Sequence, residues 1–542
     1  MVNRNILLVE PGYRNKYPPL GLMKIAQYHG PLNKKDNVKF VKGEDFSAYE
    51  KAWDRIYITT LFSFEWERTA RSIDYALDLV GGQAHRVFVG GIAASLMYDR
   101  FIDEPRWRGV RFIKGLLGEA PAVSLGLDTF EEELYADDIN GKPIEDLIPD
   151  YSILEHIGYK YPVNDAYFTY ASRGCIRKCS FCGVPKLEGE QRDTKSLSEV
   201  VEGISKLYGH KRDLILMDNN VVASANFKNI ITEIIELGFE KGAKLERGSQ
   251  EINRRVDFNQ GVDARILCKD PMYLKQLSRI ALKPLRIAFD HLGLKKPYEK
   301  AIRYSADVGL TELSNYMLYN FHDSPSDLFE RMRLNVTLNE DLGIRIFSFP
   351  MRYQPVTRPD RGHVGKNWNS YFLRSMQVIL QATHGIVSGA PDFFRLAYGD
   401  TYQDFESILL RPHRYIFNRL WFEQYEGRPE FDTFQVVINA LSSDEKTELI
   451  DFLCSRNKKN YELDLNELAV GKLRNAARFF VPIPTADEIK IWEAQKRRRI
   501  EEKYTYMIPE DERVEDAGLT DEDIQPESNF KKHSDSFSLS LT

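Results

Sequence analysis

The chain has 542 residues, a formal net charge of −6 and 43% hydrophobic residues. This length predicts two to four domains and leaves room for a sizeable core. The charge gives no overall case for nucleic acid binding, and no run of eighteen or more apolar residues points to a membrane span. Five cysteines in so long a chain do not make a disulfide framework. Because the first residues also lack a signal-peptide pattern, we expect a reducing, cytoplasmic location.

Short apolar runs and helical patterns alternate through the first 115 residues. The helical patterns begin near Leu22, cross Glu67–Leu79 and open at Ile92–Leu96. Such alternation predicts an α/β fold in which helices cover a doubly wound parallel sheet. Ligands of such sheets lie beyond the carboxyl ends of the strands. We expect the strands at Ile6–Val9, Arg55–Ile58, Arg86–Val89 and Val110–Ile113.

Six further strand–helix repeats follow an acidic connector that covers 121 to about 160. Sites on parallel barrels lie at the carboxyl ends of their strands. The expected domains are an N-terminal α/β domain with its linker (1–150), a repeat domain (160–360), a helical domain (365–503) and an acidic, Ser-rich, disordered tail (508–542). We expect the six strands at Tyr167–Tyr170, Asp213–Met217, Val256–Gly261, Leu285–Phe289, Leu313–Leu318 and Ile344–Phe349.

A loop with C-x3-C-x2-C spacing directly follows the first of these six strands. Three thiolates on one short loop can hold three irons of a cubane cluster, and the absence of a fourth thiolate leaves one iron open to a small ligand. Two other interpretations stay open: a structural zinc site, for which no fourth ligand stands at the usual spacing, and three unrelated buried thiols. An aromatic residue, Phe181, precedes the third cysteine, and Gly174 and Gly183 let the backbone wrap tightly. The cysteines are Cys175, Cys179 and Cys182.

This loop resembles the signature of the radical SAM superfamily, C-x3-C-x-aromatic-C. The resemblance implies that the three cysteines hold a [4Fe-4S] cluster whose open iron binds S-adenosylmethionine (SAM). One electron from the cluster would split SAM and release a 5′-deoxyadenosyl radical, which abstracts hydrogen from an unactivated carbon. The resemblance also implies a partial (β/α)6 barrel over the repeat domain and an electron donor of the flavodoxin or ferredoxin type. The substrate class stays open between a metabolite, a lipid precursor, a peptide and a nucleic acid.

Polar residues that follow the expected strands receive SAM-binding roles from the same resemblance. Asp218, Asn219 and Asn220 follow the second strand and match the segment that meets the SAM amino group. Asp290 follows the fourth strand, where it could bind the ribose hydroxyls, and Asn320 follows the fifth and belongs to the stretch that matches the family segment that holds adenine. Residues 218–220 and Asp290 also have a structural alternative, because Asp and Asn are common helix caps.

Further residues near the expected site are also candidates for a role in it. Phe181 and Gly183 belong to the cysteine loop and count as candidate cofactor contacts through the resemblance. Arg265 could meet the SAM carboxylate, or could form a surface salt bridge. Ser324-Pro325 matches the family segment after Asn320, and it also has the residue types of an ordinary helix start.

The N-terminal domain resembles the Rossmann-type cobalamin-binding domain that precedes many radical SAM barrels. The resemblance rests on Pro19-Leu20-Gly21 with its following helix, and on Val89-Gly90-Gly91-Ile92. The cobalamin-ligating pattern Asp-x-His-x-x-Gly is absent from the turn after Ile6–Val9. Two hypotheses therefore stay open: cobalamin bound without a lower protein ligand, and a Rossmann-like domain that packs or closes over a substrate.

The expected helical domain has no motif that we recognise. Arginines and aromatics alternate at Arg411–Tyr415 and Arg419–Trp421, a mixture that could meet a nucleic acid or a phosphate. A helix face with core aromatics and solvated arginines is the simpler interpretation. Helices are expected at Trp368–Gln381, Phe405–Leu410, Phe434–Leu441, Glu445–Leu453 and Ala486–Lys503.

Taken together, these residues predict a radical SAM enzyme. One rival hypothesis is a cobalamin-dependent radical SAM methyltransferase. The other belongs to a different class: a non-enzymatic zinc- or iron-binding module that uses the helical domain to hold a partner. A fold resemblance does not name a substrate.

Overall fold

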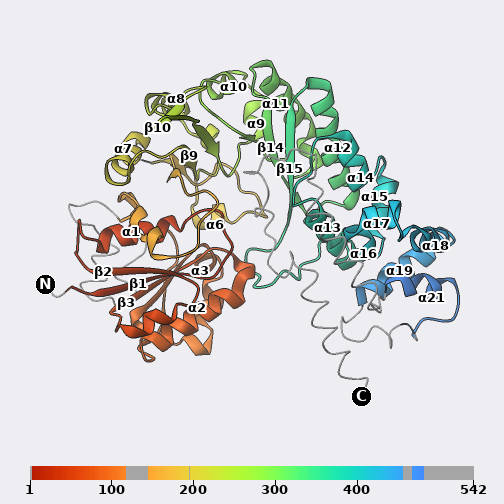
Figure 1. The fold of residues 1–542 in the computed structure, drawn as a ribbon, viewed down its shortest axis with the longest axis horizontal. Coiled ribbons are helices and arrows are strands. Elements are labelled where there is room, and N and C mark those ends of the chain that lie inside the picture. The colour runs from red at the N-terminus through yellow and green to blue at the C-terminus, as the bar shows by residue number, and fades with distance from the viewer. Residues whose placement is uncertain (1–2, 118–143, 195, 456–464, 466, 481–542) are drawn as a thin grey trace.

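The computed structural model describes residues 3–117, 144–194, 196–455, 465 and 467–480. Figure 1 shows a sheet with its helices, a second group of strands with outer helices, and a set of C-terminal helices, in chain order. Much of the acidic connector, the predicted helix 486–503 and the predicted disordered tail 508–542 lie outside the described residues. Within the described part of the chain, no helix is long and apolar enough to cross a membrane.

The N-terminal unit is a five-stranded, all-parallel sheet in the order β2-β1-β3-β4-β5. This is a common doubly wound order, with its switch point between β1 and β3. Four strands match the prediction and β2 was not predicted, because its sequence NVKFVK buries only Phe40 and Val41. The strands are β1 (Asn5–Glu10), β2 (Asn37–Lys42), β3 (Arg55–Thr60), β4 (Val87–Gly91) and β5 (Arg111–Phe112).

Both faces of this sheet are covered, as the prediction of a doubly wound sheet requires. Successive residues of a strand point to opposite faces. Ile6 and Leu8 join the core cluster that contains the apolar side of α1 (Leu20–His29). Leu7 and Val9 join the cluster that contains α2 (Trp66–Leu79), α3 (Ile92–Leu96) and α4 (Tyr98–Ile102).

The second unit, which we call the six-strand unit, contains a strand at each of the six predicted positions. Three strands form one parallel sheet and three form another, and parallel bridges at Val256–Leu282 and Val262–Ile287 join the two. The fourth strand is only two residues long, shorter than predicted. The strands are β6 (Ala166–Thr169), β9 (Asp213–Leu216), β12 (Arg255–Phe258), β13 (Leu285–Arg286), β14 (Glu312–Tyr319) and β15 (Arg345–Arg352).

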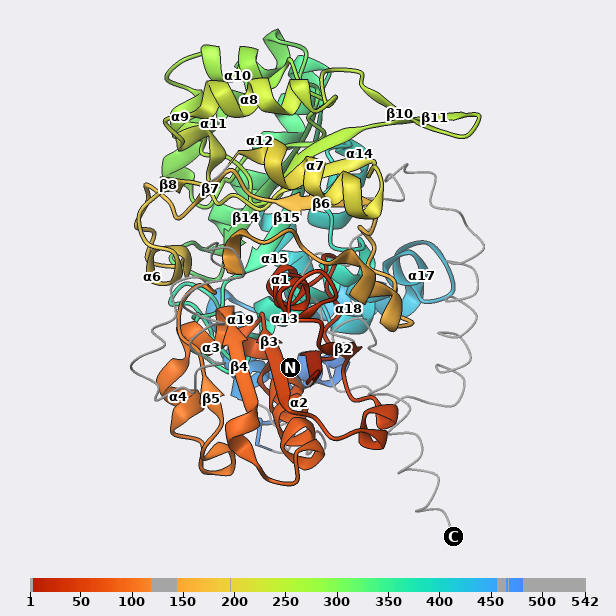
Figure 2. The same cartoon turned by 90° about the vertical axis from the view of Figure 1, so that its left-hand side faces the viewer.

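Helices follow these strands on the outside of the six-strand unit (Figure 1). A hairpin of β10 (Lys244–Arg247) and β11 (Gln250–Asn253) interrupts the alternation and projects from the unit in Figure 2. It was not predicted, because its mostly exposed, charged residues carry no core pattern. The helices are α7 (Leu197–Tyr208), α8 (Phe227–Glu236), α9 (Ala264–Leu267), α10 (Met272–Leu277), α11 (Lys295–Asp307) and α12 (Pro325–Leu342).

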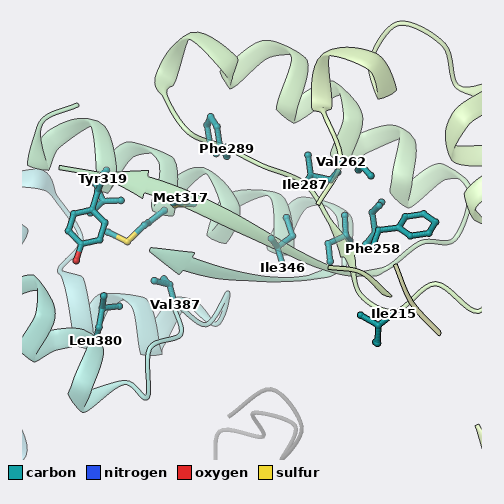
Figure 3. Packing of buried hydrophobic residues seen from close by; sticks show 14 of the residues in the cluster. Ile215, Phe258, Val262, Ile287, Phe289, Met317, Tyr319, Ile346, Leu380 and Val387 are labelled. Carbon is teal, nitrogen blue, oxygen red and sulfur yellow. The ribbon is translucent and has the colours of Figure 1, made fainter. Parts of the chain in front are cut away.

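One continuous core joins the six-strand unit to the C-terminal helices. Figure 3 shows Met317 and Tyr319 of β14 beside Leu380 of α13. Each such side chain contributes about 1.5–3 kcal/mol when it is fully buried. The C-terminal helices are α13 (Ser370–Ala382), α14 (Pro391–Tyr398), α15 (Tyr402–Leu409), α16 (His413–Phe417), α17 (Arg419–Gln424), α18 (Arg428–Asn439), α19 (Ser443–Ser455) and α21 (Lys472–Ala477).

The mixture of arginines and aromatics in these helices is a packed face. Tyr415 is fully buried, which confirms the interpretation of core aromatics. The arginines are not solvated as expected: Arg411 pairs with Glu423 at 2.7 Å, and Arg414 pairs with Glu430. These partners neutralise the charge that a phosphate would need.

Candidate functional site

The three cysteines lie on one loop between two short strands. β7 (Ser172–Arg173) pairs antiparallel with β8 (Arg192–Asp193), and this pair closes the loop that also contains α6 (Val184–Leu187). Gly174 has φ +75°, and a Cβ there would lie 2.3 Å from the carbonyl oxygen of Glu190. The tight return of the loop therefore needs glycine at this position. The three cysteines are free and half-buried.

The surroundings of the thiols suit sulfur ligands to iron. Backbone N–H groups of Arg177 and Val184 donate to the sulfurs of Cys175 and Cys182, each at 3.4 Å. Burial raises the pKa of the Cys182 thiol, as it does that of Cys179, where Arg265 opposes the rise in pKa. A bound metal cation overrides such shifts and deprotonates a coordinating thiol.

The described residues contain no group of three or more His, Cys, Asp or Glu side chains that could together hold a single metal ion. A zinc site needs its ligands gathered around one point. In a cubane cluster, each thiolate binds a different iron, so the three sulfurs need not meet. The three free thiols on the loop are a donor set that suits three irons of such a cluster.

Asp218, one of the predicted SAM contacts, is directed at the backbone that leads into the cysteine loop. Its carboxylate accepts hydrogen bonds from the N–H of Ala171 at 2.9 Å and from the N–H and hydroxyl of Ser172 at 2.5 and 2.7 Å. The residue is 1% exposed, and burial raises the pKa of its carboxyl to about 6. It is not a helix cap in this structure, and its contact with SAM stays a prediction.

The two neighbours of Asp218 differ from it. Asn219 donates through Nδ2 to Glu188 at 2.8 Å. Asn220 is 3% exposed, and its Oδ1 has no hydrogen-bond partner among the residues that the structure describes. A buried carbonyl oxygen without a donor is costly, so Oδ1 of Asn220 is an acceptor that a ligand could satisfy, as is Oε1 of the neighbouring Gln191.

Glu188 was missed by the sequence analysis, although it has several loop contacts. Its Oε2 accepts from the N–H of Gly174 at 2.8 Å and from Nε of Arg173 at 3.0 Å, besides Asn219. A single glutamate in a glycine-containing loop carries no recognisable sequence signal. The contacts of Glu188 are seen only in the structure, where the loop between β7 and β8 brings its carboxylate to the N–H of Gly174.

Asp290 and Arg265 lie close enough to the cysteines to affect their titration. Burial raises the pKa of the Asp290 carboxyl to about 6, while Arg331 and Arg265 oppose that rise. Arg265 is also bound to Asp263 at 2.8 Å, and Asp263 binds Arg177 of the cysteine loop at 2.7 Å. Arg265 therefore forms a salt bridge, as one of its two interpretations predicts, and this salt bridge lies beside the cysteine loop.

Asn320 is fully buried, and its side chain is used by the segment that follows β15. Nδ2 donates to the carbonyl oxygens of Tyr353 and His363, both at 3.1 Å, and Oδ1 accepts from the N–H of Gly365 at 2.7 Å. The contact of Asn320 with adenine stays a prediction.

The segment after Asn320 begins a helix and contacts the cysteine loop. Ser324 and Asp327 form a reciprocal capping box at the start of α12, so the helix-start interpretation is confirmed. Phe181, the aromatic of the cysteine motif, packs edge-on against Phe321 at 5.6 Å between ring centroids. The aromatic position of the motif thus joins the loop to the end of β14.

The carboxyl edge of the N-terminal sheet faces the cysteine loop. A Cβ at Gly183 would lie 2.9 Å from Cδ1 of Leu96 in α3, so the exit of the loop is packed against the N-terminal unit. Tyr17, in the loop after β1, donates to Oδ1 of Asn259 beyond β12 at 2.6 Å. Figure 1 shows α6 between the two units. The contact of Gly183 with a cofactor stays a prediction.

A cavity of about 600 Å³ lies apart from this loop, at the carboxyl ends of β1 and β2. Its lining includes Gly12, Arg14 and Lys42, together with residues 156–159. None of the residues predicted to bind a cofactor lines it.

No family model matches the chain. Over 243 residues the chain is 26% identical to an uncharacterized methyltransferase, sll1242, of Synechocystis sp. (strain ATCC 27184 / PCC 6803 / Kazusa). That match covers 43% of this chain and 40% of the curated relative, so the chain spans well under two thirds of the relative's length.

Two solved proteins also resemble the chain. TsrM, a radical S-adenosylmethionine methyltransferase from Kitasatospora setae with cobalamin and a [4Fe-4S] cluster bound, has a TM-score of 0.43 at 16% identity, over 66% of this chain and 77% of TsrM. SuiB of Streptococcus suis, bound to S-adenosylmethionine, has a TM-score of 0.26 at 14% identity, over 40% and 47% of the two chains.

Proposed function

We propose that the chain is a radical SAM enzyme whose six-strand unit is the partial (β/α)6 barrel of that superfamily. The observation that carries the proposal is the set of three free thiols, on one loop, at the carboxyl ends of parallel strands. Cys175, Cys179 and Cys182 would hold a [4Fe-4S] cluster. When bound, this cluster supplies one electron that cleaves SAM to a 5′-deoxyadenosyl radical.

The chain's own residues would position SAM and the substrate. Oδ1 of Asn220 is buried and accepts no hydrogen bond from the residues that the structure describes, so it suits an ammonium group. Asp290, beside Cys179 and Cys182, can accept hydrogen bonds from hydroxyls. The N-terminal unit, which packs on the loop at Gly183, would exclude water and oxygen. A flavodoxin- or ferredoxin-type protein would supply the electron.

The test is reductive cleavage of SAM by protein reconstituted anaerobically with iron and sulfide. We expect 5′-deoxyadenosine from the wild-type chain and from Cys268→Ala, which alters a free cysteine outside the loop. We expect none from Cys179→Ala. Zinc in the purified protein, with no cluster absorbance and no nucleoside, would instead support a metal-binding interaction module.

A cobalamin-dependent radical SAM methyltransferase is the second candidate. It is supported by the carboxyl edge of the N-terminal sheet, which faces the cysteine loop through Leu96 and Tyr17, and by the name of the 26% identical relative. The test is corrinoid absorbance in protein produced with added cobalamin, followed by transfer of a labelled methyl group from SAM to a product. Protein that binds no corrinoid but forms 5′-deoxyadenosine would reject this candidate and retain the first.

A further inference from the structure

Two carboxylates, the buried Asp218 and the partly buried Glu188, hold the backbone that leads into Cys175. Asp218, at the end of β9, accepts from the N–H groups of Ala171 and Ser172. Glu188, across the loop, accepts from the N–H of Gly174. Three of the four amides that precede Cys175 therefore donate to a carboxylate from another part of the chain. Hydrogen bonds to charged acceptors are stronger than neutral ones, at about 1.5–3 kcal/mol each.

The second carboxylate belongs to a chain of contacts that reaches the N-terminal unit. Oε2 of Glu188 accepts from Nε of Arg173 at 3.0 Å, and NH1 of Arg173 binds Oε1 of Glu145 at 3.0 Å. Glu145 in turn accepts from Lys24, whose ammonium is buried in helix α1 and donates to the hydroxyl of Tyr170 at 2.6 Å. This network starts in the N-terminal unit and ends one residue before the first cysteine.

We propose that Asp218 and Glu188 are positioning residues that preset the cysteine loop, and that Lys24 makes this positioning depend on the docking of helix α1. The inference rests on the proposed function for its cluster readouts alone. It changes the role of Asp218 from a contact with SAM to a support of the ligand loop. Within the segment after β9, contact with the SAM ammonium then falls to Asn220.

The experiment uses matched pairs of isosteric substitutions in the full chain. Asp218→Asn replaces one acceptor oxygen by an NH2 that faces backbone donors. Its control is Asp213→Asn, at the opposite end of the same strand, where the carboxylate binds Arg212 and Arg255. Glu188→Gln likewise replaces one acceptor oxygen by an NH2, which would face the N–H of Gly174. Its control is Glu190→Gln on the same loop, because the exposed Glu190 carboxylate lies 3.6 Å from the exposed Lys178 ammonium.

The first readout is amide hydrogen exchange of the cluster-free protein. We expect exchange at 171–174 to become about tenfold faster in Asp218→Asn and Glu188→Gln, which corresponds to the loss of one such hydrogen bond. Both controls should exchange like the wild type at these amides. Unchanged exchange in both test variants, with intact melting curves, would overturn the positioning role.

The second readout is the electron paramagnetic resonance spectrum and midpoint potential of the reconstituted, reduced cluster. We expect altered g values or a shifted potential in both test variants, and wild-type behaviour in both controls. If the wild-type chain assembles no [4Fe-4S] cluster, the proposed function fails, while the exchange experiment still decides on the positioning. If clusters form and all five proteins give the same spectrum and potential, the positioning role fails and the proposed function stands.

Lys24→Met tests the link to the N-terminal unit, because it keeps the length of the side chain and removes the ammonium. We expect faster exchange at 173–174 and a smaller spectral change in the same direction as Glu188→Gln. Wild-type exchange and spectrum in Lys24→Met would reject the link and leave the roles of Asp218 and Glu188 unaffected.

Discussion

The carboxyl edges of the two parallel units face each other, but they differ in what lies on them. In the six-strand unit, Asp218 and Asn320 follow β9 and β14, and both are almost fully buried and hydrogen-bonded to backbone. At the edge of the N-terminal sheet, Tyr13, Phe62 and Phe64 follow β1 and β3 and pack against one another.

This difference separates two kinds of information. Strand topology indicates where a ligand can lie, and it indicates both edges equally. Residue types indicate which chemistry is possible, and among the described residues the thiols lie at the edge of the six-strand unit. The N-terminal edge presents aromatic rings together with the ion pair of Glu10 and Lys42. The predictions that follow test this asymmetry.

Loss of a cysteine should have the largest effect. Cys182→Ser, like Cys179→Ala, should abolish the cluster, because a hydroxyl is a poor ligand for these irons. The expected outcome is less iron and sulfide per chain and nucleoside formation at background. Cys454→Ser, a free cysteine in α19, is the control and should behave as the wild type. Equal loss in both variants would contradict the assignment of the loop.

A matched pair of glycines should separate the two edges. Gly174 and Gly91 both have positive φ, and an added Cβ would lie 2.3 Å from the Glu190 oxygen and 2.5 Å from the Thr60 oxygen, respectively. Each change to Ala should destabilise its own unit by about 1–3 kcal/mol. Gly174→Ala should also lose bound iron, whereas Gly91→Ala should keep it. The measurements are the iron content and the melting temperature of the two variants. Iron loss from Gly91→Ala but not from Gly174→Ala would contradict the assignment of the cluster to the six-strand unit.

Asp218 should make the stability of the cluster-free protein depend on pH. Burial raises the pKa of its carboxyl from the usual 3.8 to about 6, so the folded state binds this proton more tightly than the unfolded state does. The stability that this proton contributes is present below pH 4 and is lost as the pH rises through 6. The total is at most about 3 kcal/mol. Asp218→Asn should show less of this loss, as denaturant unfolding of both proteins between pH 4.5 and 7 would reveal; parallel pH profiles would contradict it.

Loss of the edge-on ring contact between Phe181 and Phe321 should have the smallest effect. Aromatic pairs of this geometry contribute about 0.5–1.5 kcal/mol beyond their buried area. Phe181→Leu should therefore keep the cluster and slow SAM cleavage by only a few-fold. Phe46→Leu, at a ring that is 84% exposed in the N-terminal unit, is the control and should change neither property. Loss of the cluster in Phe181→Leu would show that the ring does more than pack.

Much of the architecture could be predicted from the sequence. Apolar runs such as Ile6–Val9 and Ile344–Phe349 become buried strands because both faces of their sheets are covered. The strand β2 and the hairpin of β10 and β11 were not predicted, because their partly or fully exposed residues have no pattern of buried positions. An edge or hairpin strand forms because it pairs with a neighbouring strand, and its own sequence does not reveal that pairing.

The candidate site could be predicted in kind but not in detail. The three cysteines identify themselves by spacing. The partners of Asp218 and Asn320 do not, because they come from segments about 45 residues away along the chain. A polar residue at a strand end can meet a ligand or fix a neighbouring loop, and only the three-dimensional arrangement distinguishes the two. Glu188 had no sequence signal at all.

The hydrogen bond between Tyr17 and Asn259 has a consequence for biosynthesis, since it joins residues 242 positions apart. The ribosome makes the covering N-terminal edge first, at roughly 5–20 residues per second. Roughly 12–50 s then pass before Asn259, its partner directly after β12, has been made. During this interval the cysteine loop emerges without its complete cover. Delivery of iron and sulfide to the nascent chain, and oxidation of its thiols, would compete in that time.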